Sequence, residues 1–301
     1  MEDRIRANGK YNFKKNAPLY LMMLPFMLLF FTFTILPVMM ATFTSFTLYD
    51  VINPPSFVGL ENFRRLFLED DLFIRSIQNT FVLASIIGPV GYMLSFFMAW
   101  LINELPRKLR AVLTIIFYSP SMAGAAYIGF FLLFFSGDPF GYLNSFLLAN
   151  GFIEEPRIWL EDPAAMTNIV IGTQLLMSMG IGFLSFVAGL QVIDKAQYEA
   201  GYIDGIKNRW QELWFITLPN MKPQLMFGAI MTITGVLGLD PSALMGFPSP
   251  GYETHTIANH LLDFGSVRME MGYASAIALL LLALMLSCNW LFQQFLKRVG
   301  T

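Results

Sequence analysis

The residues with the clearest chemical pattern lie in a polar stretch from Tyr198 to Pro223, flanked on both sides by long apolar runs. The residues from Ala196 to Ile203 favour helix, and Asp204-Gly205 is a strong signal for a turn or a helix end. A second helix is predicted from Asn208 to Thr217. We expect Pro219 to end it, because the residue before a proline is disfavoured in the helical region. The stretch should therefore fold as a helix-turn-helix in which Gly205 adopts a positive φ.

Both predicted helices carry an aromatic face, formed by Tyr198 and Tyr202 on the first and by Trp210, Leu213, Trp214 and Thr217 on the second. Packed helices shift as a unit, so this element is suited to transmitting a rigid-body push from a docked partner. An amphipathic helix lying on the inner leaflet, anchored by Trp and Tyr, has the same composition. The residues alone leave both interpretations open.

The composition of the chain is that of a membrane protein, with 55% hydrophobic and only 13% charged residues. A spanning helix needs about 20 apolar residues. Six runs approach this length: Leu19–Thr44, Thr80–Ile102, Val112–Phe135, Thr167–Gln191, Gln224–Leu239 and Tyr273–Phe295. The fifth is short and contains three glycines, so by itself it is also consistent with a buried or broken helix. We therefore expect an all-α, polytopic protein with six transmembrane helices.

The distribution of Lys and Arg predicts the orientation of these helices. If both termini are inside, fourteen of the nineteen basic residues lie in inside segments, and the other five lie outside: Arg64, Arg65, Arg75, Arg157 and Arg268. An excess of Lys and Arg on the cytoplasmic side is the usual topology signal. It places both termini and the Tyr198–Pro223 stretch in the cytoplasm. The basic N-terminal segment is interpreted as a topology anchor, with no nucleic-acid role, and the first helix as retained.

The chain reads as one membrane domain without internal repeats. We expect residues 1–76 to contain the cytoplasmic N-terminus, a peripheral first helix and an outer loop, and residues 77–301 to form a five-helix core with a cytoplasmic loop at 194–223. Within the outer loop, Phe63, Leu66 and Phe67 fall at helical spacing and predict a short interfacial helix.

Several kinds of site are not supported by the sequence. No G-x-x-x-x-G-K-[ST] phosphate loop occurs, so the chain does not bind ATP through that motif. His255 and His260 are five apart with no nearby cysteine, which favours a solvated loop or an interface role over a metal site. Cys288 is the only cysteine, so no disulfide forms within the chain. The spans are almost free of ionisable residues, whereas a proton-coupled carrier usually contains them.

Polar residues within the apolar runs are candidates for a substrate path: Gln174, Ser178, Thr232, Thr234 and Asn289. Gln174 and Ser178 are four apart and share a helix face. A sugar would need hydrogen-bonding groups of this kind. The alternative is that they join helices by interhelical hydrogen bonds, which is the usual use of such residues in membranes.

The cytoplasmic loop resembles the EAA coupling loop of ABC importer permeases, with its E-A-A, glycine and I-x-L-P pattern. The matching residues are Glu199, Ala200, Gly201, Asp204, Gly205, Ile216, Leu218 and Pro219. The chain departs from that pattern at Gly201, where the family has alanine, and at Ile206, where alanine usually follows the glycine.

Other motifs occur in the family's order along nearly the whole chain. Val58–Phe63 resembles the family's f-v-G-L-e-N-F, Asn79-Thr80 its N-T, Gly141–Asn144 its G-x-x-N, Trp159–Pro163 its W-L-x-d-P, and Ala188–Gln191 its A-G-L-Q. Thr256-Ile257 and Gly272–Ala276 match the segment that leads into the last helix. The chain is thus similar to carbohydrate-class, maltose-type ABC importer permeases.

The resemblance implies the type I importer permease fold and a multi-pass protein of the bacterial cell membrane. It implies a second homologous permease, two ATPase subunits that dock on the coupling loop, an extracellular solute-binding protein, and a carbohydrate substrate, an oligosaccharide. ATP and Mg would be used by the ATPases, and no cofactor by this chain, which would not be an enzyme. The alternative is a secondary carrier or an integral membrane enzyme that uses no ATPase.

Overall fold

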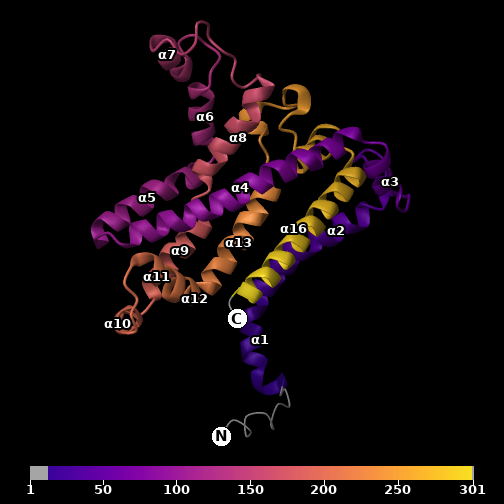
Figure 1. Ribbon diagram of the computed structural model, residues 1–301. Coiled ribbons are helices and arrows are strands. Elements are labelled where there is room, and N and C mark those ends of the chain that lie inside the picture. Colours follow the sequence, from indigo (N-terminus) through magenta and orange to yellow (C-terminus); the bar gives the residue numbers. More distant parts are fainter. Residues whose placement is uncertain (1–12, 300–301) are drawn as a thin grey trace.

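The computed structural model describes residues 13–299 and is essentially all-helical (Figure 1). The first half contains α1 (Phe13–Phe30), the π-helical turn η2 (Phe31–Ile35), α2 (Leu36–Thr44), α3 (Glu61–Leu68), α4 (Asp71–Asn103), α5 (Arg107–Ala123), α6 (Ala125–Phe134) and α7 (Tyr142–Ala149). Two-residue strands, β1 (Thr47–Leu48) and β2 (Ser56–Phe57), pair antiparallel between α2 and α3. The short helix predicted around Phe63, Leu66 and Phe67 is confirmed as α3.

The second half contains α8 (Pro163–Met177), α9 (Ile181–Val192), α10 (Lys195–Ile203), α11 (Arg209–Glu212), η3 (Leu213–Thr217), α12 (Leu218–Asn220), α13 (Lys222–Leu237), α14 (Ser242–Met245), η4 (Pro250–Tyr252), α15 (Ile257–Leu262), η5 (Asp263–Val267) and α16 (Met271–Val299). Part of the predicted orientation rests on Arg4, Arg6 and Lys10, which lie outside the described residues.

Of the six predicted spans, four or five are found in the described residues by length and composition. Four helical segments are long and apolar enough to cross a membrane, namely Ala17–Thr44, Asp71–Asn103, Pro163–Val192 and Met271–Gln294. The predicted third span is bent by 88° between α5 and α6, so it counts as a fifth only if the pair is one span. The predicted fifth span is α13, whose 16 residues extend about 24 Å at 1.5 Å per residue. That is shorter than a hydrocarbon core of about 30 Å.

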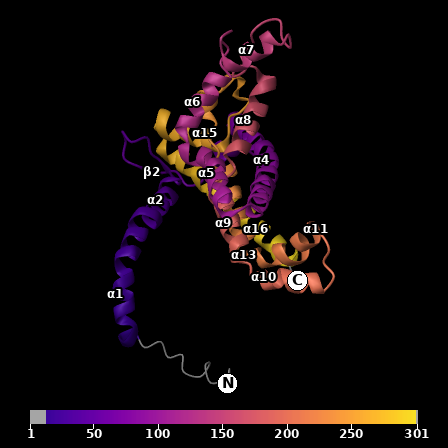
Figure 2. The ribbon, with the colours of Figure 1, turned by 90° about the vertical axis from the view of Figure 1, so that its left-hand side faces the viewer.

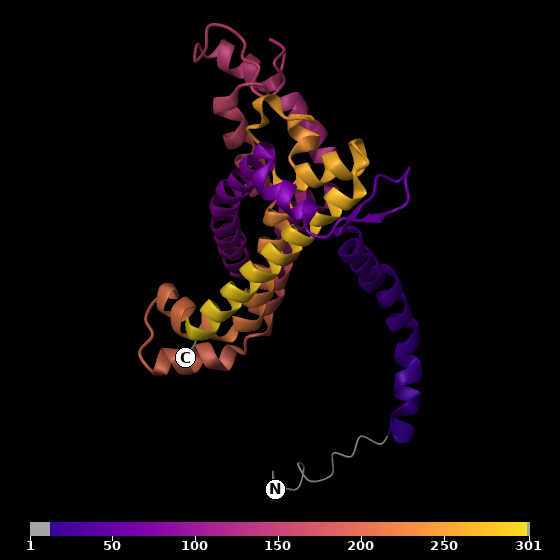
Figure 3. The same cartoon turned by 90° about the vertical axis from the view of Figure 1, so that its right-hand side faces the viewer.

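The core is formed by α4, α9 and α13, which pack against one another, while α16 packs against α13 and α2. Phe96, Phe183 and Phe186 are at the centre of one buried cluster. The N-terminal helix stands apart from this body in Figures 2 and 3, and the most apolar window of its span is 0% buried. The coupling region around α10 and the outer helices α3 and α7 lie toward opposite ends of the molecule (Figure 1).

Two asparagines in the quoted motifs join separate segments through hydrogen bonds. Asn62 donates to the carbonyls of Ser45 and Thr47. Asn144, which is completely buried, accepts a hydrogen bond from the Trp159 indole at 2.8 Å and so joins two motifs that are separate in the sequence. Buried amides need such partners, because an unpaired buried polar group is costly.

The two histidines are buried, so of the two predicted roles, a solvated loop or an interface, the solvated loop is wrong. His255 is 2% exposed and His260 is 1% exposed. They are covered because the segment that carries them folds back against α4 and packs beside Phe73 and Phe264. A short polar loop in the sequence gave no sign of this long-range packing.

Candidate functional site

The first helix of the coupling segment, which we define as residues 194–223, ends in a closed turn at Gly205. Asp194 caps the start of α10 by accepting a hydrogen bond from the Ala196 N–H. At its end, the Ile206 N–H donates to the Gly201 carbonyl at 2.9 Å and the Gly205 N–H donates to the Tyr202 carbonyl. This pair of bonds is the Schellman arrangement, which requires a left-handed residue after the helix. Gly205 has φ of +96°, so the predicted positive φ is confirmed.

The second helix of the segment does not end at Thr217, contrary to the sequence-based prediction. It continues from α11 through a π-helical turn, η3, into α12, and Pro219 lies in the first turn of α12. Leu218 keeps helical dihedral angles, and its N–H donates to the Leu213 carbonyl five residues back. A proline inside a helix removes one hydrogen bond. Here the local widening to a π turn lets the helix pass it.

The two helices of the coupling segment are bonded to each other. The Tyr198 hydroxyl lies 3.0 Å from the Thr217 hydroxyl, and the Asn220 amide donates to Gln197 at 2.6 Å. Leu213, Ile216 and Thr217 are buried between the helices and the membrane core, whereas Trp210 and Trp214 are mostly exposed. The predicted aromatic stripe is therefore divided between a buried and an exposed face.

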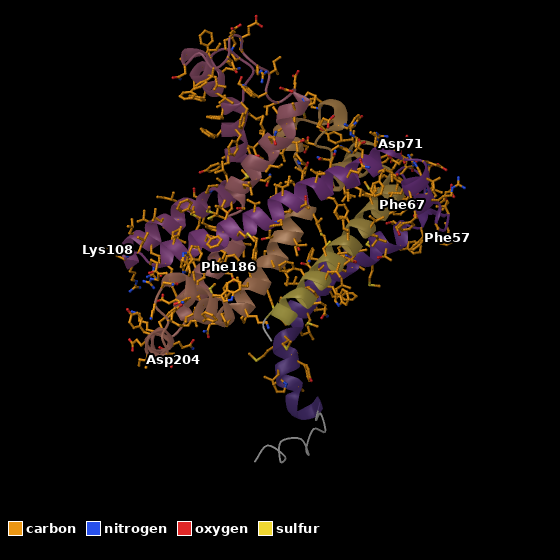
Figure 4. The ribbon with its side chains drawn as sticks, viewed as in Figure 1. Phe57, Phe67, Asp71, Lys108, Phe186 and Asp204 are labelled. Carbon is orange, nitrogen blue, oxygen red and sulfur yellow. The ribbon has the colours of Figure 1, made fainter. Side chains whose placement is uncertain are left out.

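The outer surface of α10 carries charged and apolar side chains that this chain leaves uncovered. Glu199 and Asp204 are exposed, and within the described residues neither carboxylate makes an ion pair. Tyr202 is 71% exposed and Ile203 is 87% exposed. Asp204 lies at the tip of the segment, at the opposite end of the molecule from Asp71 (Figure 4). Exposed apolar residues rimmed by charge are typical of a protein-protein contact.

A second contact joins the coupling segment to the C-terminal end of α4. The Trp210 ring lies 5.5 Å from that of Trp100 and 6.4 Å from that of Phe97. Arg209 pairs with Glu104, just beyond α4, at 2.7 Å. Together with the packing of Leu218 and Met221 on the core, these contacts connect the segment to the spans.

Gly201 and Ile206, the two residues that differ from the family pattern, are close to each other in the structure. A Cβ atom added at Gly201 would lie 2.6 Å from Cδ1 of Ile216 and 3.0 Å from Cδ1 of Ile206. The side chain of Ile216 and, less closely, the larger side chain at 206 thus occupy the space that an alanine at 201 would need. Two unusual residues therefore complement each other within the turn.

We expect Gly201→Ala to destabilise the turn by overpacking, at a cost of about 1–3 kcal/mol, and expect Ile206→Ala to remove part of that cost. The measurement is the loss of folded chain on heating in mild detergent, for both single variants and the double variant. Residues in contact show interaction energies of about 0.5–3 kcal/mol. Strictly additive effects in the double variant would contradict the proposed complementarity.

Three of the predicted substrate-path residues, Gln174, Ser178 and Thr232, line one cavity of about 240 Å³. The cavity lies between α4, α8, α9 and α13, and no ionisable side chain lines it. The other lining residues are Ile87, Ser95, Met177, Gly180, Ile181, Gly182, Phe186, Met231, Gly235, Val236 and Leu239. The Gln174 amide makes no hydrogen bond within the described chain, and the hydroxyl of Thr232 donates to the Gly228 carbonyl.

A break in the predicted fourth span forms one wall of this cavity. The chain leaves helical geometry at Ser178–Gly180, between α8 and α9, and the first turn of α9 has no side-chain cap. Ser95 of α4 donates to the Ser178 carbonyl at 3.0 Å. Non-helical backbone at membrane depth is tolerated where it is buried in protein or lines a cavity. Sequence reasoning missed this break, although Gly180 and Gly182 in mid-run were a signal for it.

The other two predicted path residues lie elsewhere. The Asn289 amide of α16 donates to the Thr234 hydroxyl of α13 at 3.5 Å, and neither residue lines the cavity. They match the alternative interpretation, in which intramembrane polar residues join helices.

Residues 89–301 match the family model described as the binding-protein-dependent transport system inner membrane component. The chain belongs to this family of ABC importer permeases. It is an inner-membrane, multi-pass component of the carbohydrate-uptake type, and subunits of this kind are transmembrane components without catalytic activity. Family membership overturns the alternative of a carrier or membrane enzyme that works without an ATPase.

The sequence of this permease aligns with curated relatives over most of its length. It is 31% identical over 282 residues to the probable ABC transporter permease protein YesP of Bacillus subtilis, covering 90% of this chain and 87% of that protein. It is also 31% identical over 280 residues to the arabinooligosaccharides transport system permease protein AraP of the same organism, covering 91% and 86%.

The fold matches that of a solved transporter chain. A bacterial ABC transporter involved in the import of the acidic polysaccharide alginate aligns with a TM-score of 0.79, at 24% identity, over 96% of this chain and 98% of that one. A second structure of the alginate transporter, in complex with an alginate pentasaccharide-bound periplasmic protein, aligns equally well at 23% identity. This likeness establishes the importer permease fold.

Proposed function

We propose that this permease carries a carbohydrate, an oligosaccharide, across the inner membrane, as one half of a path completed by a second homologous permease. Two ATPase subunits dock on the coupling segment, and an extracellular solute-binding protein delivers the substrate. The observation that carries the proposal is the coupling segment, whose exposed Glu199, Tyr202, Ile203 and Asp204 are held on a rigid element joined to the core.

The cavity supports a carbohydrate as the substrate. Its polar groups are uncharged amide, hydroxyl and backbone groups, which suit the hydroxyl groups of a sugar, and its walls come from broken and short helices. Gln174, Ser178 and Thr232 are proposed to contact the substrate. The relative AraP is named for arabinooligosaccharide transport, which agrees with this class of substrate.

The coupling residues are proposed to act in two groups. Glu199, Ala200 and Asp204 form the exposed docking surface, and Gly201 and Gly205 shape the turn that presents it. Ile216, Leu218 and Pro219 lie on the second helix, where Ile216 is buried and Leu218 packs against the membrane core. The first group receives the push of the ATPase, and the second passes it to the spans.

The test is purification of the tagged chain from its native membrane in mild detergent, followed by identification of the co-eluting subunits. We expect an ATPase and a second permease to co-elute, and ATP hydrolysis in proteoliposomes to rise with binding protein and a cognate oligosaccharide. Recovery of the chain without any ATPase would contradict the proposed coupling. ATP hydrolysis that responds to no sugar in an oligosaccharide panel would contradict only the substrate class.

Orientation is proposed with six crossings, α13 included, and both termini in the cytoplasm. In a Cys288→Ser background, Asn208→Cys and Arg107→Cys are expected to react with a membrane-impermeant maleimide only from the cytoplasmic side. Glu155→Cys, the matched control, should react only from outside. Labelling of position 208 from outside would reverse the orientation and remove the coupling segment from the reach of an ATPase.

A further inference from the structure

The segment from Ser249 to Asp263, which we call the outer clasp, joins two core helices. Asn79 of α4 donates to the carbonyls of Tyr252 and His255 at 3.0 Å, and the Ile257 N–H donates to the Thr80 hydroxyl at 3.0 Å. Arg75 pairs with Glu253 at 2.8 Å. These bonds fix the clasp along the first turns of α4.

The clasp is also bonded to the end of α13. The Thr256 hydroxyl donates to the Leu239 carbonyl at 2.7 Å, and the Asn259 amide donates to the Asp240 carboxylate. Leu239 lines the cavity that contains Gln174. The clasp therefore connects α4 to α13 beside the cavity, at the end away from the coupling segment.

The two histidines continue this connection as a chain with a fixed direction. His260 Nε2 lies 3.0 Å from Asp70 Oδ2, and His260 Nδ1 lies 3.1 Å from His255 Nε2. A carboxylate only accepts, so His260 donates through Nε2, and in the neutral form of this ring Nδ1 is the acceptor. His255 must then donate through Nε2, which leaves its Nδ1 as a bare acceptor. That atom is buried without a partner among the described residues.

A further proton has one place to bind in this chain, at Nδ1 of His255. There it would create a buried N–H without an acceptor beside Phe247 and Tyr252, whose rings lie 6.1 and 5.5 Å from that of His255. The charged and titratable groups around the pair are Asp70, Tyr273, Tyr252, Asp240, Asp263, Arg268, Arg65, Arg75 and Glu253. Asp70 is already engaged by His260, by the Tyr273 hydroxyl and by the Phe73 N–H.

We propose that His255 and His260 are positioning residues that hold the outer clasp closed while both are neutral, and that protonation from outside the cell releases it. The outward direction rests on the orientation given in the proposed function. Release would free the clasp from α4 and from Leu239 and Asp240 at the end of α13, beside the cavity. Opening of the clasp would then depend on the pH outside the cell, through this histidine pair.

The direction of the pH effect follows from burial. Burial, followed by the neighbouring His260, lowers the pKa of His255 from 6.5 to about 4. Burial alone would raise the pKa of Asp70, but the hydrogen bonds from His260 and Tyr273 hold it well below its usual range, so it remains an acceptor. A released, hydrated His255 binds a proton more readily than the closed one. The closed state is therefore fully favoured above about pH 6.5 and loses stability as the pH falls toward 4.

Hydrogen–deuterium exchange tests this proposal on the assembled transporter in nanodiscs, with exchange corrected for its intrinsic pH dependence. Protection of the clasp peptide should fall about tenfold between pH 7.5 and 5.5, the change that a shift from 6.5 to about 4 gives by linkage. The chain has only two histidines, and both belong to the clasp.

Two variants assign the effect to His255. His255→Gln keeps a hydrogen-bond donor, and His255→Phe keeps a flat ring between Phe247 and Tyr252; either should give a protection that does not change with pH. A wild-type profile that stays flat, or a variant that falls in parallel with the wild type, would overturn the proposal. If no ATPase co-elutes, that result counts against the proposed function. The pH dependence of exchange in the clasp still tests the role of the histidines.

Discussion

Replacing Gly205 by valine is expected to abolish transport while leaving the spans inserted. Gly205 has φ of +96°, which closes the Schellman turn at the end of α10. A Cβ atom there would meet nothing within 4 Å, so the penalty is backbone strain and not a clash. Such strain costs about 1–3 kcal/mol, and relieving it would displace Glu199 and Asp204 from the docking surface.

The readouts for Gly205→Val are substrate-stimulated ATP hydrolysis and uptake in reconstituted vesicles, with co-elution of the subunits measured in parallel. Gly205→Asn should retain more activity, because asparagine tolerates the left-handed region. Gly151→Val is the matched control, since Gly151 also has a positive φ, of +70°, and open space around it, but lies after α7. Glu199→Ala should weaken ATPase association more mildly than Gly205→Val. Normal transport by Gly205→Val would show that the segment does not carry the force.

Replacing Gly228 by valine should remove most of the folded protein from the membrane. A Cβ atom at Gly228 would lie 2.3 Å from the Phe186 ring. That ring cannot easily rotate away, because it is 1% exposed and packs edge-on against Tyr92 and Phe96. Helices in membranes use small residues where their backbones approach closely. The substitution should therefore separate α9 from α13, with an overpacking cost of about 1–3 kcal/mol or more.

The amount of folded chain is measured by fluorescence-detected size exclusion after mild extraction. Gly235→Val is the matched control, because Gly235 lies two turns further along α13 with nothing within 4 Å. It should give a normal amount of folded protein. Phe186→Ala should partly rescue Gly228→Val by opening the space that valine needs. Equal yields of the two valine variants would contradict close packing of α9 and α13.

Features governed by neighbouring residues could be predicted from the sequence. The first helix of the coupling segment and the positive φ at Gly205 follow from a helix-favouring run and a glycine after Asp204, and both are confirmed. Membership in the importer permease family followed from the order of the motifs and is also established. The end of the second helix was misjudged at Pro219, because a π turn can compensate locally for the lost hydrogen bond.

The sequence by itself thus determined a polytopic helical permease and the local shape of its coupling turn, since helix propensity, turn chemistry and apolar length act over a few residues. The tertiary structure alone decided the pairing of Gly201 with Ile206, the cavity shared by Gln174 and Thr232, and the burial of His255 against His260. It also separated Thr234 and Asn289 from that cavity. These features depend on which helix faces meet, and that choice is made by packing between segments distant in the chain.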